Sequence, residues 1–257
     1  MPTISEIYQH LNTVLPASLS CDWDNDGLMV CADPEAEVKT ILFALDITPA
    51  VVEYAEKIGA QLIISHHPLI FSGIRRMDGH DGTTRKVMSL LRHDISAMSF
   101  HTRLDAADGG VNDILAQLFS LSDVLKFGVE GDTAARIGTL PSPMAFEDFC
   151  RLVKETLHAP SVCGAKGGGT VSRLAVLGGS GKDYIREAQK MGADTYLTGE
   201  VNYNYLPEAA ENGLSVVTAG HYHTEAPFTA FFEKTLTEAF GNLEFVHFPG
   251  KCEFFYC

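Results

Sequence analysis

Two adjacent histidines, His66 and His67, follow a short apolar run and come directly before Pro68. The run, Leu62-Ile63-Ile64, is continuous and β-branched, which is typical of a strand buried on both faces of a parallel sheet. Pro68 cannot donate a ladder hydrogen bond, so pairing should end before it. Because ligands bind at the carboxyl ends of strands in open α/β sheets, the pair lies where a ligand is expected.

The histidine pair by itself leaves the number of ions open. Neighbouring residues of an extended chain point in opposite directions, so one ion would not readily take both imidazoles. Two ions side by side would use the pair more naturally. The alternative is a chance doublet in a loop, and only the residues downstream argue against it.

Two later predicted strands end in a histidine followed four residues on by a carboxylate. Residues 95–100 lead into His101 and Asp105, and the strand around Val216-Val217 leads into His221 and Glu225. Imidazole and carboxylate together suit zinc, iron, manganese, nickel or copper. Two such ions, roughly 3.5–4 Å apart, can activate water and stabilise a leaving oxygen. The predicted ligands are His66, His67, Asp105, His221 and Glu225.

Other residues near these ligands have two interpretations each. His101 could bind the metal or could orient a ligand by hydrogen bonding, and the second role is favoured. His223 could also orient a ligand, or it could be a loop histidine without such a role. Arg103 contacts an anionic substrate or neutralises Asp105 or another carboxylate.

Two further clusters are favoured as structural turns. The cluster Asp24-Asn25-Asp26 is more typical of a turn than of a cation site. The turn at residues 178–181 could bind an anion, but its spacing matches neither a P-loop nor a dinucleotide fingerprint. Gly179, Ser180 and Glu200 are therefore weak candidates for substrate binding.

Composition limits the class of protein. The chain has 257 residues, 46% of them hydrophobic, with a net charge of −14 and a pI near 5.0, which argues against non-specific binding to nucleic acid. No run approaches the roughly 20 apolar residues of a membrane span. Residues 1–8 lack the pattern of a signal peptide. The six cysteines form no CxxC pair, so we expect a reducing cytoplasm.

The order of predicted elements indicates an α/β fold of two pseudo-symmetric lobes with mostly parallel sheets. Lys57-Ile58-Gly59-Ala60 in the first half matches Lys190-Met191-Gly192-Ala193 in the second, which suggests an internal duplication, although two ordinary βαβ units could match by chance. We expect a first lobe over 1–125 and a second over 126–257. An aromatic segment, residues 243–248 and 253–256, should form a last strand that packs back on the first lobe.

Several motifs occur in order over nearly the whole chain: residues 65–68, 101–107, 109–113, 178–181, 197–200 and 220–225. Together they resemble the Nif-three-like family, also called type 2 GTP cyclohydrolase homologues, in its short form. The resemblance implies two α/β lobes with a dinuclear metal site between them, in a toroidal homohexamer whose metal sites face the inner cavity. Its ligand positions fall on the same five residues. At 202–205 the chain reads Asn-Tyr-Asn-Tyr, where the family often has two histidines.

This resemblance leads to three hypotheses about function. The first is a hydrolase with two divalent ions (zinc, iron, manganese or nickel) that acts through metal-bound water on a small anionic or nucleotide substrate. The second is a non-enzymatic metal-binding or metal-handling protein. The third is a ring-shaped scaffold for nucleic acid or protein partners. The net charge argues against nucleic acid as the partner.

Overall fold

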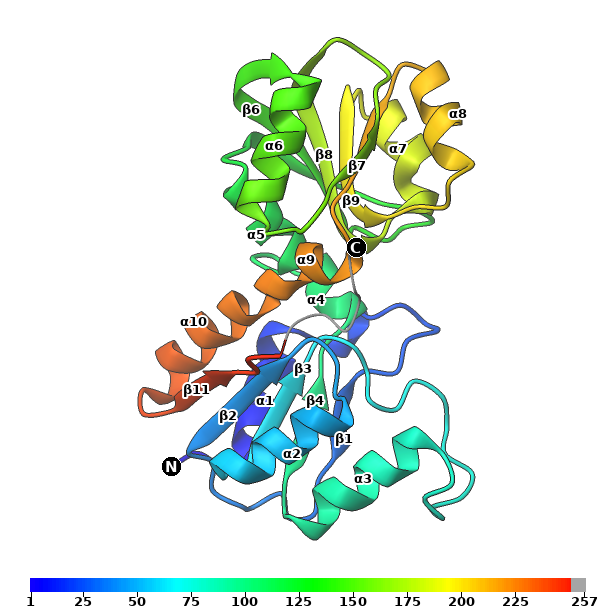
Figure 1. Cartoon of the computed structure of the whole chain (residues 1–257). Coiled ribbons are helices and arrows are strands. Elements are labelled where there is room, and N and C mark those ends of the chain that lie inside the picture. Colours follow the sequence, from blue (N-terminus) through cyan, green and yellow to red (C-terminus); the bar gives the residue numbers. More distant parts are fainter. Residues whose placement is uncertain (251–257) are drawn as a thin grey trace. The chain divides into compact units, whose positions relative to one another are not determined.

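The computed structural model describes residues 1–250 and divides into two compact units. The first unit comprises Met1–Leu104 and the described residues from Thr229 onward, and the second comprises Asp105–Phe228. The strand predicted at residues 253–256 lies outside the described residues. Each unit contains one mixed sheet between helices (Figure 1).

The first unit is built on a five-stranded sheet in the order β1-β4-β3-β2-β11. Strands β4, β3, β2 and β11 are parallel, and β1 pairs antiparallel with β4. The elements are α1 (Ile4–Val14), η1 (Ala17–Leu19), β1 (Gly27–Val30), β2 (Thr40–Ala44), α2 (Pro49–Ile58), β3 (Leu62–Ser65), α3 (Gly82–Arg92), β4 (Ser96–Ser99), α10 (Thr229–Phe240) and β11 (Glu244–His247). Helix α4 (Thr102–Ala106) contains the boundary between the units.

Local sequence explains where these helices begin and end. Thr3 caps α1 and exchanges hydrogen bonds with Glu6 in a capping box. Thr48 caps α2, Pro49 occupies its first turn, and Gly59 ends it with a φ of 67°. Strand β1 was not predicted, because its four residues give too short a pattern to recognise.

Alternating residues of the central strands cover the two faces of this sheet. Leu42, Ile63 and Ala97 lie side by side across β2, β3 and β4 and pack with apolar residues of α2 and α3. On the opposite face, the Phe43 ring stacks on Phe232 of α10, with ring centroids 6.1 Å apart. The sheet is therefore buried on both faces, as the continuous apolar run of β3 predicted.

The second unit has a six-stranded sheet in the order β5-β6-β8-β9-β10-β7. Strands β8, β9 and β10 are parallel, whereas the outer pairings are antiparallel. The elements are α5 (Val111–Leu118), β5 (Ser122–Phe127), β6 (Ala135–Ala145), α6 (Phe146–Thr156), β7 (Cys163–Ala165), β8 (Thr170–Ser180), η2 (Lys182–Tyr184), α7 (Ile185–Lys190), β9 (Thr195–Glu200), α8 (Tyr205–Glu211), β10 (Ser215–Thr218), α9 (His221–Glu225) and η3 (Ala226–Phe228).

Two prolines lie inside strand β6. Pro141 and Pro143 fall in the part of β6 where the pairing with β8 shifts register, between Thr139 and Met144. A bulge leaves such residues without ladder partners, so the missing N–H groups of proline cost no hydrogen bond there. The following helix, α6, begins at Phe146.

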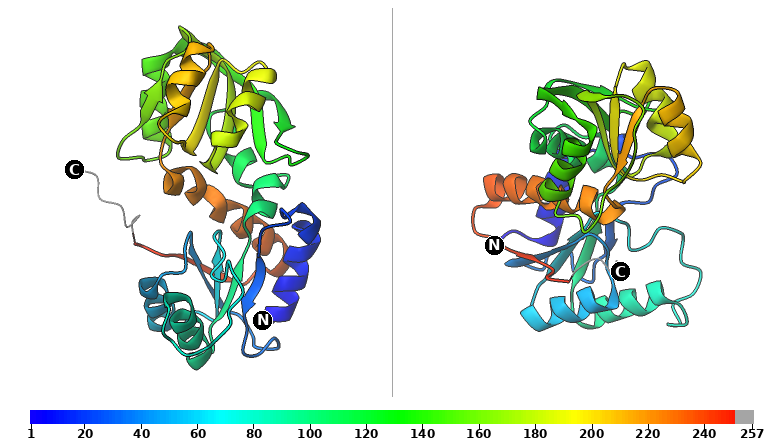
Figure 2. Two further views of the ribbon diagram at one scale, coloured as in Figure 1. Left: turned by 90° about the vertical axis from the view of Figure 1, so that its right-hand side faces the viewer. Right: turned by 45° about the horizontal axis from the view of Figure 1, so that its top comes forward.

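Both units repeat one chain order, in which three parallel strands alternate with helices: β2-α2-β3-α3-β4 in the first and β8-α7-β9-α8-β10 in the second. Leu174, Val176 and Leu197 pack with α5 and α6, whereas Tyr196 and Val216 pack with α7 and α8. Figure 2 shows these layers from two further directions. The structure confirms the predicted α/β class.

No helix within residues 1–250 has the length and apolar character that a membrane crossing requires.

A buried arginine should be the most sensitive ionic group of the second unit. Arg136 is 0% exposed, and its guanidinium donates to the Asp113 carboxylate and to the carbonyls of Ala107 and Ala134. Removing one partner of a buried pair costs roughly 3–5 kcal/mol. We therefore expect Arg136→Met to lower the urea midpoint of unfolding, followed by circular dichroism. Arg151→Met, which breaks an exposed pair with Asp148, should change stability by less than about 1 kcal/mol. Equal midpoints for the two variants would contradict the prediction.

Candidate metal centre

The chain bends where strand β3 ends, and this bend sets the directions of the histidine pair. The Ser65 hydroxyl donates to the His67 carbonyl at 2.8 Å, and the His67 N–H donates to Leu45. The two imidazole centroids lie only 5.2 Å apart. The expectation that they point in opposite directions was wrong, because His66 and His67 follow the strand and are not part of it.

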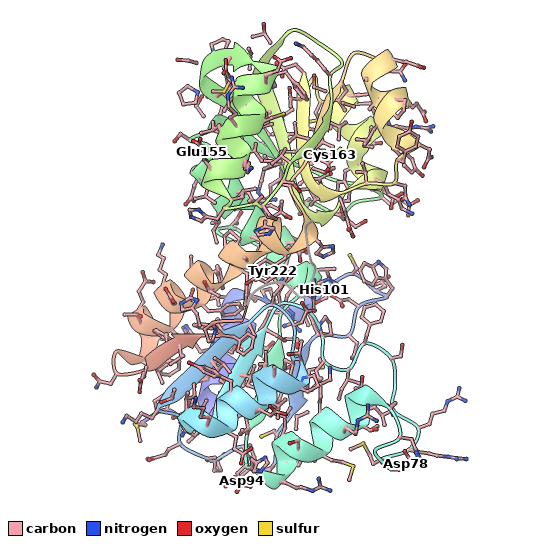
Figure 3. The ribbon with its side chains drawn as sticks, viewed as in Figure 1. Asp78, Asp94, His101, Glu155, Cys163 and Tyr222 are labelled. Carbon is pink, nitrogen blue, oxygen red and sulfur yellow. The ribbon has the colours of Figure 1, made fainter. Side chains whose placement is uncertain are left out.

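Three histidines of the first unit come together at the ends of two neighbouring strands. His66 and His67 follow β3, and His101, labelled in Figure 3, follows β4. One ligand atom from each of the three lies within 4.8 Å of the others. Three imidazoles form a donor set that suits zinc and other divalent transition metals.

Each of these rings is held through Nδ1. The Nδ1 of His66, a residue with no exposed surface, lies 3.0 Å from the carbonyl oxygen of Phe100. The Nδ1 of His67 lies 2.8 Å from the Asp46 carboxylate, and that of His101 lies 3.0 Å from the Asp24 carboxylate. A carbonyl or carboxylate at Nδ1 fixes the proton there and the orientation of the ring, so a metal ion would be bound through Nε2. This arrangement is typical of histidine ligands.

The turn at residues 24–26 supports His101 and is structural, as predicted. The Asp24 side chain has no exposed surface and accepts hydrogen bonds from the Thr102 N–H and hydroxyl. Burial raises the pKa of the Asp24 carboxyl, but the hydrogen bonds from His101 and Thr102 outweigh this effect and lower the pKa to about 2. Asp24 is therefore charged at neutral pH and stabilises a donating Nδ1–H on His101.

Arg103, on helix α4, is bound to the same turn. Its buried guanidinium donates to the Asp26 carboxylate, to Asn12 and to the Leu15 carbonyl. These contacts give Arg103 a structural role in the first unit, in which it neutralises the Asp26 carboxylate.

In the second unit, His221 and Glu225 lie one turn apart on helix α9. The His221 Nε2 is 3.0 Å from the Glu225 carboxylate, and its Nδ1 is 3.0 Å from Glu200 at the end of β9. The i, i+4 spacing explains why the two side chains meet. Glu200, a weak candidate for substrate binding, thus holds a histidine in the way that Asp46 and Asp24 do.

Gly179 lets the backbone approach this pair. Strand β8 continues through Ser180 with a shift in its pairing after Leu177, so residues 178–180 are the irregular end of a strand. Gly179 has a φ of 68°, and a Cβ there would lie 2.2 Å from the Glu225 Oε1. A side chain at this position would displace the carboxylate. Ser180, the other weak candidate here, is exposed at the end of the strand.

Asp105 is positioned by a buried asparagine. Asn112 donates to the Asp105 carbonyl at 3.3 Å and accepts from the Gly178 N–H at 2.8 Å. A Cβ on Gly178 would lie 3.1 Å from the Glu225 side chain, so Asn112 connects the backbone at Asp105 with the strand end beside Glu225.

His223 lies two residues after His221 on α9. Its ring meets that of Tyr222 edge-on, with centroids 5.4 Å apart, and Tyr222 is labelled in Figure 3. Burial lowers the pKa of His223 below its ordinary value, so its ring is neutral at neutral pH.

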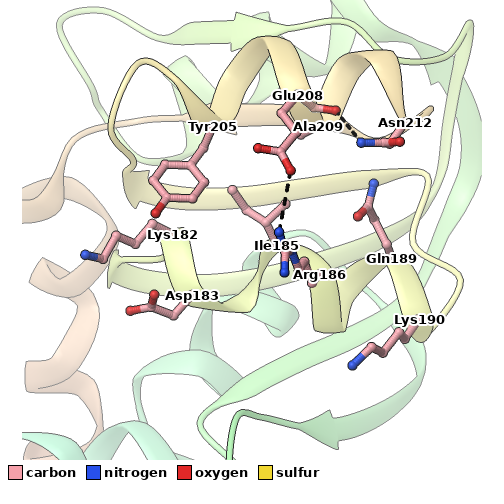
Figure 4. Close-up of a pocket in the computed structure, with 10 residues that line it drawn as sticks. All are labelled: Lys182, Asp183, Ile185, Arg186, Gln189, Lys190, Tyr205, Glu208, Ala209 and Asn212. Carbon is pink, nitrogen blue, oxygen red and sulfur yellow. Dashed lines mark hydrogen bonds and ion pairs between the residues drawn. The ribbon is translucent and has the colours of Figure 1, made fainter.

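A separate hollow of about 600 Å³ lies between α7 and α8 of the second unit (Figure 4). Its lining has charges of both signs, and Arg186 and Glu208 form an ion pair of 3.7 Å across it. It contains none of the predicted site residues, and its lining has no histidine or cysteine that would bind a transition metal.

The fold and these side chains define a two-unit α/β protein with histidine and carboxylate groups that could bind metal. The chain belongs to the Duf34/NIF3 (NGG1p interacting factor 3) family, whose model matches residues 2–251. This finding confirms the resemblance seen in the motifs.

Similar proteins support this assignment. A Clostridium perfringens protein named "GTP cyclohydrolase 1 type 2 homolog" is 30% identical over 249 residues, 95% of each chain. The reduced HcgD structure from Methanocaldococcus jannaschii has a TM-score of 0.84 and 31% identity, covering 97% of this chain and 98% of that one. A Bacillus cereus protein related to NIF3 has a TM-score of 0.90 and 22% identity, covering 100% and 99%, and shows the shared fold.

The lowered pKa of Asp24 predicts how stability depends on acid. Because the folded-state pKa is about 2 and the ordinary value is 3.8, the unfolded chain binds this proton more readily. The contribution to stability, on the order of 2 kcal/mol, is present above pH 4 and is lost as the pH falls toward 2. Urea unfolding between pH 2.5 and 5 should show a shallower pH dependence for Asp24→Asn than for the wild type. Identical slopes would contradict the assignment.

Proposed function

We propose that this protein is a metal-dependent hydrolase that holds two divalent ions and acts on a small anionic or nucleotide substrate. One observation carries the proposal: four histidines, in both units, have Nδ1 held by a carboxylate or carbonyl oxygen. This arrangement prepares Nε2 as a metal ligand. The name of the Clostridium perfringens relative supports a nucleotide, and GTP is the first substrate to test.

The proposed ligands are His66 and His67 from the first unit, and Asp105, His221 and Glu225 from the second. The donor set of imidazoles and carboxylates fits zinc, iron, manganese or nickel. We propose that these five residues bind two divalent ions and that the chain forms a homohexamer. Divalent ions held there would polarise a substrate oxygen and make water a better nucleophile.

The protein's own side chains have defined parts in this proposal. Asp46, Asp24 and Glu200 fix the tautomers of His67, His101 and His221, because a carboxylate at Nδ1 favours the ring with its proton on that nitrogen. Gly179 leaves room for the Glu225 carboxylate. Together these groups hold the ligand atoms in place before an ion arrives, which lowers the cost of binding.

Metal content tests the proposal directly. We expect elemental analysis to find about two ions per chain in the wild type, and fewer in His66→Ala/Glu225→Ala at unchanged oligomer mass. The control is His93→Ala, because His93 pairs with Glu56 on the surface, away from the proposed ligands. If the protein holds no metal after reloading with zinc, manganese or iron, the proposal of a metal-dependent hydrolase is wrong.

Turnover separates a hydrolase from a protein that only binds metal. Steady conversion of GTP that is lost in Asp105→Ala would support catalysis at this centre. Equal turnover in that variant would show that the site is wrongly assigned. Stoichiometric metal without conversion would favour the non-enzymatic alternative.

The hydrogen bond from His67 to Asp46 predicts a graded effect on affinity. Asp46→Asn keeps the shape of the side chain but removes the carboxylate that fixes the His67 proton at Nδ1. Losing such a partner weakens metal binding roughly 10–100-fold. Competition with a chelator measures this change. Glu56→Gln, which alters the carboxylate partner of His93, is the matched control and should bind metal like the wild type. A wild-type affinity in Asp46→Asn would argue that His67 is not a ligand.

A further inference from the structure

Two large aromatic side chains lie exposed together on the first unit. Trp23 is 62% exposed and Phe71 is 52% exposed, and their ring centroids are 6.2 Å apart. Single exposed apolar residues are ordinary, but a pair in contact is a local apolar surface in a strongly acidic chain.

This aromatic pair adjoins the histidine group. The Trp23 ring lies 6.0 Å from the His101 ring, at an interplanar angle of 73°. His101 in turn shares the three-histidine group with His66 and His67. A ligand that covers Trp23 would therefore reach the candidate metal ligands of the same unit.

The surrounding hydrogen bonds hold both aromatic residues in place. Asp24, the residue after Trp23, is buried and bound to His101 and Thr102. The next residue, Asn25, donates through its side chain to the carbonyl of Ile70, which directly precedes Phe71. The two aromatic segments are thus tied to each other and to His101. A preformed surface loses little freedom when it binds a ligand.

We propose that Trp23 and Phe71 stack against a planar aromatic ring of the substrate, while its anionic part reaches the histidine group. This inference rests on the proposed function, narrows its substrate to a compound with a flat heterocycle such as a nucleobase, and assigns the two residues that bind the ring. Two adjoining side chains match one such ring, whereas a stable protein interface needs roughly 800 Å² on each partner. The net charge of −14 favours a single nucleotide over a polynucleotide.

The chain has one tryptophan, so its fluorescence reports directly on Trp23. Titration of the metal-loaded protein with GTP should quench this fluorescence to saturation. Inorganic tripolyphosphate, which has the same kind of anionic chain but no ring, should bind without quenching. Equal responses to the two probes, or no saturable response to GTP, would overturn the stacking.

Variants of the aromatic pair give a second measurement. Stacking on an aromatic side chain is worth roughly 1–3 kcal/mol per base, so Phe71→Ala and Trp23→Ala should weaken GTP binding roughly five- to 150-fold by calorimetry. Trp23→Phe should restore most of the affinity. The control is Leu91→Ala, which removes an exposed apolar side chain from α3. Unchanged affinity in both alanine variants would overturn the inference.

Two measurements on the same samples separate the possible failures. If either alanine variant has a lower oligomer mass, the pair is a contact between copies of the chain and the inference is wrong. If the wild type holds metal but GTP leaves Trp23 unaffected, this inference fails and the metal centre stands. If GTP quenches Trp23 in a protein that holds no metal, the proposed metal-dependent hydrolase is contradicted, whereas the stacking of the base on Trp23 is supported.

Discussion

One hydrogen bond at Nδ1 sets the orientation of each of four candidate histidines, His66, His67, His101 and His221. The acceptors are the Phe100 carbonyl and the carboxylates of Asp46, Asp24 and Glu200. Without them a ring could rotate or exchange its proton between the two nitrogens. The acceptors are fixed in their turn, since Asp24 is buried and accepts two further hydrogen bonds from Thr102. The sheet of the first unit supplies the frame there, because His66 and His101 follow β3 and β4, which are parallel to each other and fully buried.

The part of the structure that depends on local sequence could be predicted. The capping residues Thr3 and Thr48 and the left-handed Gly59 define helix ends within a few residues, and the apolar runs define β2 and β3. The histidine groups also followed from position, because residues after parallel strands meet at one edge of a sheet.

The partners of the histidines could not be predicted, because they are distant in the chain. Asp24 is 77 residues from His101, and Glu200 is 21 residues from His221. Nothing in the local pattern of Asp24 distinguishes a buried acceptor from a solvated turn residue. The relative direction of His66 and His67 could not be predicted either, because it depends on where β3 ends. The place of Pro141 inside β6 depends on a register shift that only the partner strand β8 defines. Asn112 lies within the 109–113 motif, but that motif did not indicate its hydrogen bonds to Asp105 and Gly178.

The order of the units along the chain has a consequence for synthesis. The second unit, residues 105–228, lies in sequence between the two parts of the first, whose strand β11 pairs with β2. During translation the complete second unit therefore emerges before the first can finish its sheet. Until residues 244–247 arrive, the β2 edge has no neighbour on that side, and an open parallel edge can pair with other chains. A chaperone would therefore matter most in the interval before residues 244–247 are synthesised, when the first unit is still incomplete.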